Sequence, residues 1–92
     1  MGAIRATVSI HGRVQGVGFR FHTCDQAEHY RLTGWVRNSW HGTVEAVFEG
    51  EEADVRAIVE WCRRGPSFAR VSHVEVEYHP ATGEFTEFSV TG

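Results

Sequence analysis

Apolar and polar residues alternate in three stretches of this 92-residue chain, at 4–10, 44–49 and 74–78. Alternation with a period of two is typical of a strand that buries one of its faces. The short stretch Trp35–Asn38 precedes a hairpin turn and predicts another strand, and residues 85–91 predict a short closing strand. We therefore expect four strands and a possible fifth.

Two stretches between these strands show helical spacing instead. From Phe21 to about Leu32, the residues Cys24, Ala27 and Tyr30 are three positions apart and predict a helix with one apolar face. A second predicted helix begins with a group of acidic residues, which the helix dipole favours at an N-terminus. Its Arg-Arg-Gly-Pro sequence predicts the C-terminal end. The apolar positions of this second helix are Val55, Ile58, Val59 and Cys62.

The order strand–helix–strand–strand–helix–strand is that of the split βαβ motif. Because crossover connections are right-handed, both helices are expected on the same face of the sheet. We therefore predict one α+β domain over residues 1–92 with a ferredoxin-like sandwich fold. Its antiparallel sheet would contain four or five strands, with two helices packed on one face.

The composition excludes several classes of function. A net charge of −3 argues against nucleic-acid binding, which requires a basic surface. No apolar run is long enough to span a membrane. The N-terminus enters the first strand pattern almost at once, so no secretory signal is visible and we expect a cytoplasmic protein. All nine basic residues are arginine, which excludes lysine chemistry such as a Schiff base.

The cysteines and histidines do not indicate a metal site. Cys24 and Cys62 fall on the apolar faces of different helices, and we expect both to be reduced core thiols. His22 and His29 are seven residues apart on one predicted helix, too far to share an ion easily. We interpret all six histidines as solvated and without ligand partners. They are His11, His22, His29, His41, His73 and His79.

The most informative segment is the glycine-rich stretch 12–20, Gly-Arg-Val-Gln-Gly-Val-Gly-Phe-Arg, between the first strand and the first helix. Its glycines allow positive φ and a close approach of the backbone to a ligand. Successive amide N–H groups followed by a helix N-terminus form a concave anion site. Arg20 adds a planar charged group suited to phosphate oxygens. The predicted phosphate-binding loop comprises Gln15, Gly16, Val17, Gly18, Phe19 and Arg20.

This loop is neither a dinucleotide-binding fingerprint nor a Walker A motif. Together with 34–38 (Gly-Trp-Val-Arg-Asn) and 42–45 (Gly-Thr-Val-Glu), it closely resembles acylphosphatase, and the similarity covers nearly the whole chain. The resemblance implies hydrolysis of small acyl phosphates to a carboxylate and inorganic phosphate, with no cofactor and no metal. It also implies that Arg20 binds the phosphate and that Asn38 orients the attacking water.

These residue types suit that reaction. A carboxylate leaving group, whose conjugate acid has a pKa of about 4, departs without being protonated. The enzyme therefore has to stabilise the phosphate charge and position a water molecule. The neutral carboxamide of Asn38 can both accept from and donate to water. We expect a phosphate oxygen to take the water's proton, Gln15 to contribute its backbone amide, and the protein to act as a monomer on small molecules alone.

Other functions on the same fold stay open at this point. A non-catalytic module that binds phosphate or carbamoyl phosphate is one alternative, because similar domains occur inside larger maturation proteins. An RNA-binding domain of this architecture would show aromatic residues on its central strands within a basic surface, and these are missing. A metal-carrying domain would have thiols in the first loop, where this chain has glycines.

Three positions depart from the family pattern. Arg31 stands where the family often has a glycine that ends the first helix, and a left-handed arginine would cost about 1 kcal/mol. His41 occupies a turn position often held by a charged residue, and Gly92 replaces an aromatic residue found in many relatives. We expect Trp35 and Trp61 to pack in the fold and Trp40 to be exposed near the entrance of the site.

Overall fold

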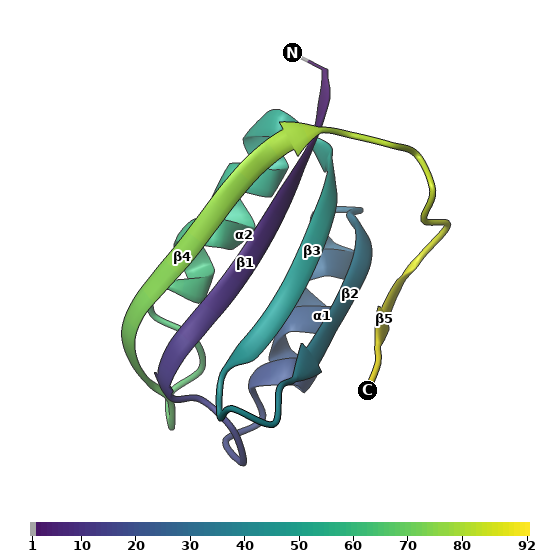
Figure 1. Ribbon diagram of the computed structural model, residues 1–92. Helices are drawn as coiled ribbons and strands as arrows, with labels where there is room; N and C mark the ends of the chain where they lie inside the picture. Colours follow the sequence, from purple (N-terminus) through teal and green to yellow (C-terminus); the bar gives the residue numbers. More distant parts are fainter. Residues whose placement is uncertain (1) are drawn as a thin grey trace.

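The computed structural model describes residues 2–92, which form five strands and two helices (Figure 1). In chain order the elements are β1 (Ala3–Arg13), α1 (Phe19–His29), β2 (Thr33–Asn38), β3 (Val44–Glu51), α2 (Glu52–Cys62), β4 (Arg70–Pro80) and β5 (Phe88–Val90). Both helices are 11 residues long. Within the described residues, neither helix has the length and apolarity that crossing a membrane requires.

The five strands form one sheet in the order β4-β1-β3-β2-β5, and both helices cover the same face (Figure 1). This arrangement confirms the predicted α+β ferredoxin-like fold. Neighbouring strands from β4 to β2 pair antiparallel, as expected, but β5 pairs parallel to β2, so the sheet is mixed. After β4 the chain crosses to the opposite edge of the sheet and reverses direction. As a result, β5 runs in the same direction as β2 (Figure 1).

The core lies between the sheet and the two helices. As predicted, α2 buries Val55, Ile58, Val59 and Cys62, while β1 buries Ala6, Val8 and Ile10. The predicted bounds of α1 were wrong, because the helix spans Phe19–His29 and also buries Phe19 and Thr23. Of the predicted apolar positions, Ala27 is fully buried, and Cys24 and Tyr30 are partly buried against the core. The hydroxyl of Thr23 is accommodated there because it donates to the Phe19 carbonyl at 2.7 Å.

Both cysteines are free thiols, but only one lies fully in the core. Cys62 is completely buried, as expected, whereas Cys24 packs against the core but is only partly buried. Burial raises the pKa of both thiols above the ordinary value, and for Cys24 the nearby Glu28 carboxylate adds to the effect. A raised pKa keeps a thiol protonated and unreactive at neutral pH.

Helix α1 ends in a Schellman motif whose left-handed residue is Arg31, with φ 58°. The Arg31 N–H donates to the Glu28 carbonyl at 3.1 Å, and the Leu32 N–H donates to the Ala27 carbonyl at 2.9 Å. This pair of bonds defines the motif, which normally places glycine at the left-handed position. Arg31 is the only residue other than glycine with positive φ in the part of the chain described.

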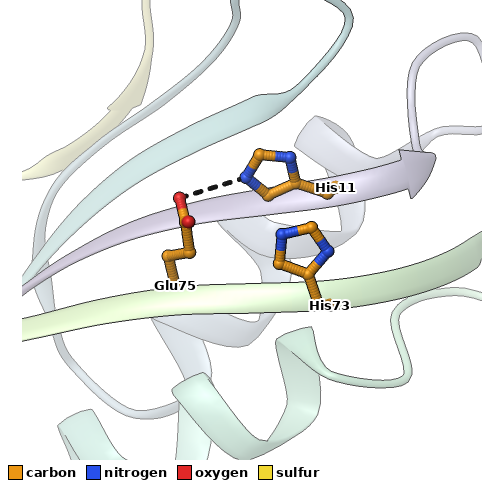
Figure 2. A group of neighbouring side chains, drawn as sticks. All are labelled: His11, His73 and Glu75. Carbon is orange, nitrogen blue, oxygen red and sulfur yellow. Dashed lines mark hydrogen bonds and ion pairs between the residues drawn. The ribbon is translucent and has the colours of Figure 1, made fainter.

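Strand β4 is longer than predicted at both ends, because it begins at Arg70 and because His79 and Pro80 continue the strand opposite Arg5 and Ile4. The same pairing places His11 directly opposite His73 on the face that the helices leave open (Figure 2). Their rings stack with centroids 4.1 Å apart, a contact that the sequence alone did not predict.

The register of β1 and β4 shifts between His11 and Gly12, directly before the glycine-rich loop. Gly12 has φ +124°, and a Cβ at this position would lie 2.1 Å from the Arg70 carbonyl oxygen. A side chain cannot fit there, so glycine is required for the irregular pairing. Beyond this β-bulge, Gly12 and Arg13 still pair with β4, and the chain leaves the sheet after Arg13 toward the candidate site.

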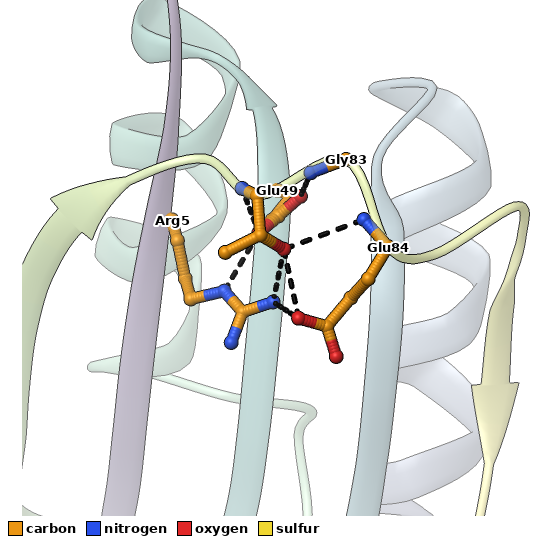
Figure 3. Close-up of polar contacts among 5 residues, drawn as sticks. Arg5, Glu49, Gly83 and Glu84 are labelled. Atoms are coloured by element: carbon orange, nitrogen blue, oxygen red, sulfur yellow. Dashed lines mark hydrogen bonds and ion pairs between the residues drawn. The ribbon is translucent and has the colours of Figure 1, made fainter.

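The segment that crosses from β4 to β5 is held by Glu49 of β3 (Figure 3). The Glu49 carboxylate accepts hydrogen bonds from the backbone N–H groups of Thr82 (2.9 Å) and Gly83 (3.1 Å) and pairs with Arg5 at 2.6 Å. Strand alternation had placed Glu49 on the polar face, but this segment covers it and leaves it 4% exposed. By fixing the crossing, Glu49 helps to bring β5 beside β2.

Burial alone would raise the pKa of Glu49. The hydrogen bond from the Thr82 backbone, the Arg5 guanidinium, and the bonds from Gly83 and the Thr82 hydroxyl outweigh it and lower the pKa to about 2. Arg5 also bonds the Glu84 carboxylate at 2.9 Å, so the same guanidinium pairs with Glu49 of β3 and with Glu84 of the crossing segment. The network is therefore held together by an ionised Glu49.

Candidate active site

The glycine-rich loop connects β1 to α1 over residues 14–18. Gly18 precedes the helix in the left-handed conformation, with φ 79° and ψ 14°, and offers no side-chain cap. The first helical hydrogen bond closes only at His22, whose N–H donates to the Gly18 carbonyl at 3.0 Å. The backbone N–H groups at the start of α1 therefore have no partner within the helix, and this arrangement favours a bound anion.

Arg20 lies in the first turn of α1 and is exposed. Among residues 2–92 no carboxylate lies within ion-pair distance of its guanidinium. A positive charge at a helix N-terminus opposes the helix dipole. The combination of this unpaired charge with unpaired backbone N–H groups favours a small anion between them.

A pocket of about 320 Å³ opens beside this helix start. The loop and helix contribute Val14, Gly16, Gly18, Phe19, Arg20 and Phe21 to its lining. The opposite side is formed by Asn38 at the end of β2 and Val90 of β5. The pocket is thus built by three separate parts of the chain: the loop with the start of α1, the end of β2, and β5, which pairs with β2.

Asn38 is the last residue of β2, where it pairs with Val44 of β3, and it is half-buried. Its carboxamide makes no hydrogen bond to any other described residue, so it is available to solvent or ligand. Asn38 also lines an adjoining pocket of about 530 Å³ that includes Trp40 and His41. Trp40 is 91% exposed, as expected for a residue of the turn.

Gln15 connects the loop to the turn that follows Asn38. Its side-chain Nε2 donates to the carbonyl oxygens of Ser39 at 2.6 Å and Thr43 at 3.0 Å. The hydroxyls of Ser39 and Thr43 are 2.7 Å apart, and the His41 N–H donates to Ser39 Oγ at 3.1 Å. The loop and the strand end that carries Asn38 are therefore joined by direct hydrogen bonds.

The structure brings together most of the residues that the sequence predicted for the site. Gly16, Gly18, Phe19, Arg20 and Asn38 line one pocket. The Phe19 side chain is buried and packs edge-on against Trp61, so only its backbone can face the pocket. Gln15 and Val17 do not line the pocket: Val17 packs against the core and the Gln15 side chain bonds the turn.

Sequence reasoning missed three pocket residues, Val14, Phe21 and Val90. Val14 and Phe21 are neighbours of predicted loop residues, so the limits of the motif were drawn too narrowly. Val90 lies far away in the sequence and reaches the pocket only through the pairing of β5 with β2. A short apolar strand gave no local signal for this placement.

The acylphosphatase family model matches residues 6–90 of this chain. An acylphosphatase of Geobacter metallireducens is 54% identical over 87 residues, which cover 95% of this chain and 94% of that relative. The crystal structure of acylphosphatase from Bacillus subtilis has a TM-score of 0.93 and 32% identity, covering 97% of this chain and 99% of that one. The crystal structure of full-length HypF in the phosphate- and nucleotide-bound form has a TM-score of 0.88 and 30% identity, over 98% of this chain and 12% of that one.

The ferredoxin-like fold and its matches define a small α+β hydrolase. The chain belongs to the acylphosphatase family, since the family model and a relative at more than half identity both extend over nearly its whole length.

Proposed function

We propose that this protein hydrolyses the carboxyl–phosphate bond of small acyl phosphates and releases a carboxylate and inorganic phosphate. The backbone N–H groups of the loop and the Arg20 guanidinium hold the phosphate, and Asn38 orients the attacking water. The observation that carries this proposal is that Arg20 and Asn38, from different elements, line the same pocket at a helix start with free N–H groups.

Charge stabilisation is the main task of such a site. A phosphoryl group carries its negative charge on oxygens that must be met by fixed positive groups as the bond to the leaving group breaks. The start of α1 offers N–H groups already aligned by the helix, and Arg20 can form two parallel bonds to phosphate oxygens. Because the leaving carboxylate is weakly basic, the site needs no strong acid to protonate it.

The group that orients the attacking water should carry no negative charge, because a second anion would repel the phosphate. A carboxamide is neutral, and its oxygen can accept from the water while its nitrogen donates to a neighbouring oxygen. Asn38 has these groups free, across the pocket from the helix start. A phosphate oxygen of the substrate accepts the water's proton, so no side chain has to act as a general base near neutral pH.

The acyl group of the substrate would lie toward the apolar rim of the pocket. Phe21 is 72% exposed and Val90 is 49% exposed, and both line the same opening as Arg20. An exposed rim of this kind offers contact area but few shape restrictions. We therefore expect several small acyl phosphates, both aromatic and aliphatic, to serve as substrates.

A phosphate-binding module without catalytic activity is the second candidate function. The observation that favours it is the likeness to the HypF structure in its phosphate- and nucleotide-bound form, of which this chain matches 12%. That likeness supports phosphate binding here as well. It does not favour loss of hydrolysis, because both Arg20 and Asn38 are in place and the relative from Geobacter metallireducens is an acylphosphatase matched over 94% of its length.

Hydrolysis of benzoyl phosphate, followed by the change in its ultraviolet absorbance, distinguishes the two candidates. We expect turnover that inorganic phosphate inhibits competitively, since product and substrate share the anion site. A folded protein that binds phosphate, shown by calorimetry, but does not turn over benzoyl phosphate would support the binding module and contradict the enzyme.

A further inference from the structure

A group of side chains with metal-binding chemistry lies on the open face of the sheet. His11 of β1 pairs directly with His73 of β4, and Glu75 lies two residues further along β4, on the same face. One donor atom from each of the three side chains lies within 4.8 Å of the others. None of the three lines the pocket of Arg20 and Asn38.

The backbone fixes this grouping. Residues opposite each other in an antiparallel pair have side chains on the same face, and so do residues two positions apart in one strand. Ile10, the neighbour of His11, is buried against the helices, so His11 lies on the other face of the sheet. The three donors are therefore gathered by strand pairing, and only side-chain rotations are needed to bring them onto one ion.

The two imidazole rings are stacked, with 13° between their planes, and because a bound metal lies in the plane of each ring, both rings turn out of the stack to share one ion. His11 Nε2 is 3.2 Å from the Glu75 Oε1 atom, and Figure 2 shows a nitrogen of each ring on the side of the Glu75 carboxylate. The other nitrogen of His73, Nδ1, is 3.4 Å from the Ser72 hydroxyl. Such an outer hydrogen bond is the usual way in which a protein orients a metal-binding histidine.

We propose that His11, His73 and Glu75 bind one divalent transition-metal ion, with Zn²⁺ as the reference ion. The ligand atoms are Nε2 of each histidine and one carboxylate oxygen of Glu75, and water completes the coordination. Two imidazoles and one carboxylate suit zinc, copper and nickel, whereas magnesium and calcium prefer oxygen ligands alone. The ion replaces the direct contact between His11 Nε2 and the Glu75 carboxylate.

The required movement is small. Tetrahedral zinc with bonds of about 2.1 Å separates its ligand atoms by about 3.4 Å. The present donors lie within 4.8 Å of one another, and the open face of the sheet leaves room for side-chain movement, since His73 and Glu75 are exposed and His11 is partly exposed. Rotation of the His11 and His73 rings toward Glu75 closes the difference without moving a strand.

Binding would tie β1 to β4 beside the β-bulge that follows His11. An ion that binds the folded chain and not the unfolded chain raises the stability in proportion to its free concentration. This site is separate from the proposed hydrolytic function and requires no metal in the reaction. Its expected effect is thermal stabilisation, with the hydrolytic rate unchanged at the same temperature.

The test is a zinc titration of tag-free protein in competition with a chromophoric chelator, with the melting temperature measured in parallel. We expect one Zn²⁺ per chain and a melting temperature that rises with zinc. The variants H11Q and H73Q should each weaken zinc binding about tenfold or more, because even the loss of an outer-shell partner costs 10–100-fold. The control variant H29Q, at an exposed position of α1, should bind zinc as the wild type does.

Far-UV circular dichroism of H11Q and H73Q establishes that the sheet is intact. In nitrogen-15 NMR spectra, zinc should shift the ring nitrogens of His11 and His73 first. The proposal is contradicted if the wild type binds no zinc at one equivalent, if folded H11Q and H73Q bind it unchanged, or if the shifts appear at other histidines instead.

Discussion

The side-chain amide of Gln15 donates a 2.6 Å hydrogen bond to the backbone carbonyl of Ser39, and so joins the glycine-rich loop to the residue that follows Asn38. The same nitrogen also bonds the Thr43 carbonyl across the turn. One side chain therefore helps to hold the two walls of the pocket together. In the proposed mechanism these walls hold the phosphate and the water, so the Gln15 bonds set their relative position.

Replacing Gln15 with alanine should lower kcat and also lower the free energy of unfolding. Each lost hydrogen bond costs about 1 kcal/mol of stability, and the alignment of water and phosphate loosens, which we expect to reduce kcat by about 10- to 100-fold. Steady-state hydrolysis of benzoyl phosphate measures the effect. The matched control is Q26A on α1, outside the pocket, which should keep its turnover; equal turnover of Q15A and wild type would show that the bridge does not position the site.

The conservative variant R20K should lose most of its activity. Lysine keeps the charge but cannot form two parallel bonds to phosphate oxygens, and losing one preorganised donor of this kind costs about 100- to 1,000-fold in rate. We expect kcat/KM for benzoyl phosphate to fall by that factor. R63K, at the C-terminal end of α2, is the control, and turnover of R20K close to that of R63K would contradict a bidentate role.

Glycine at position 31 should stabilise the protein. Arg31 is held at φ 58°, a conformation that costs a non-glycine residue about 1 kcal/mol and costs glycine little. Part of the gain is offset because glycine makes the unfolded chain more flexible, so we expect R31G to add about 0.5 kcal/mol. Urea unfolding measures the change, which should leave hydrolysis unaffected; a less stable R31G would mean that the arginine side chain has a stabilising contact.

Glu49 should make the fold sensitive to acid. Its pKa of about 2 in the folded protein lies below the ordinary 4.5, so ionised Glu49 stabilises the fold above pH 4.5, and this contribution is lost as the pH falls from 4.5 toward 2. At pH 7 the contribution is at most about 3 kcal/mol. Urea unfolding of E49Q at pH 7 should show a loss of stability that becomes smaller at pH 3.

The control for this effect is E87Q, an exposed glutamate with no side-chain hydrogen bond to other described residues. Its stability should follow the wild type at both pH values. If E49Q is as stable as E87Q at pH 7, or if the difference between E49Q and wild type grows as the pH falls, the carboxylate does not hold the crossing segment as described.

Local patterns were enough to predict the fold and much of the site. The alternation that predicted strands β1, β3 and β4 and the apolar stripe of α2 are properties of adjacent residues, and the structure confirms these strands and this stripe. Gly16, Gly18 and Arg20 lie in one continuous motif, so they could be found without knowing the fold. Asn38 was assigned only by resemblance to a family, because an asparagine beside a turn is common in any protein.

The contacts that were missed connect distant parts of the chain. Strand alternation placed Glu49 on a polar face, but the later crossing segment covers it. The Gln15 bonds to the turn and the pairing of His11 with His73 arise from tertiary packing and sheet register, which adjacent residues do not specify. The error in α1 had a local cause, since Phe19 was assigned to the loop although it is the first buried residue of the helix.

The central claim is that Arg20 holds the phosphate while Asn38 orients the attacking water. The variant N38A tests it most directly, with kcat for benzoyl phosphate and the inhibition constant for inorganic phosphate measured on the same sample. We predict that kcat falls by about 100-fold or more, as for loss of another preorganised polar group, while the inhibition constant stays within about a factor of two. A large rise in the inhibition constant would make Asn38 a phosphate-binding residue, and an unchanged kcat would remove it from the reaction.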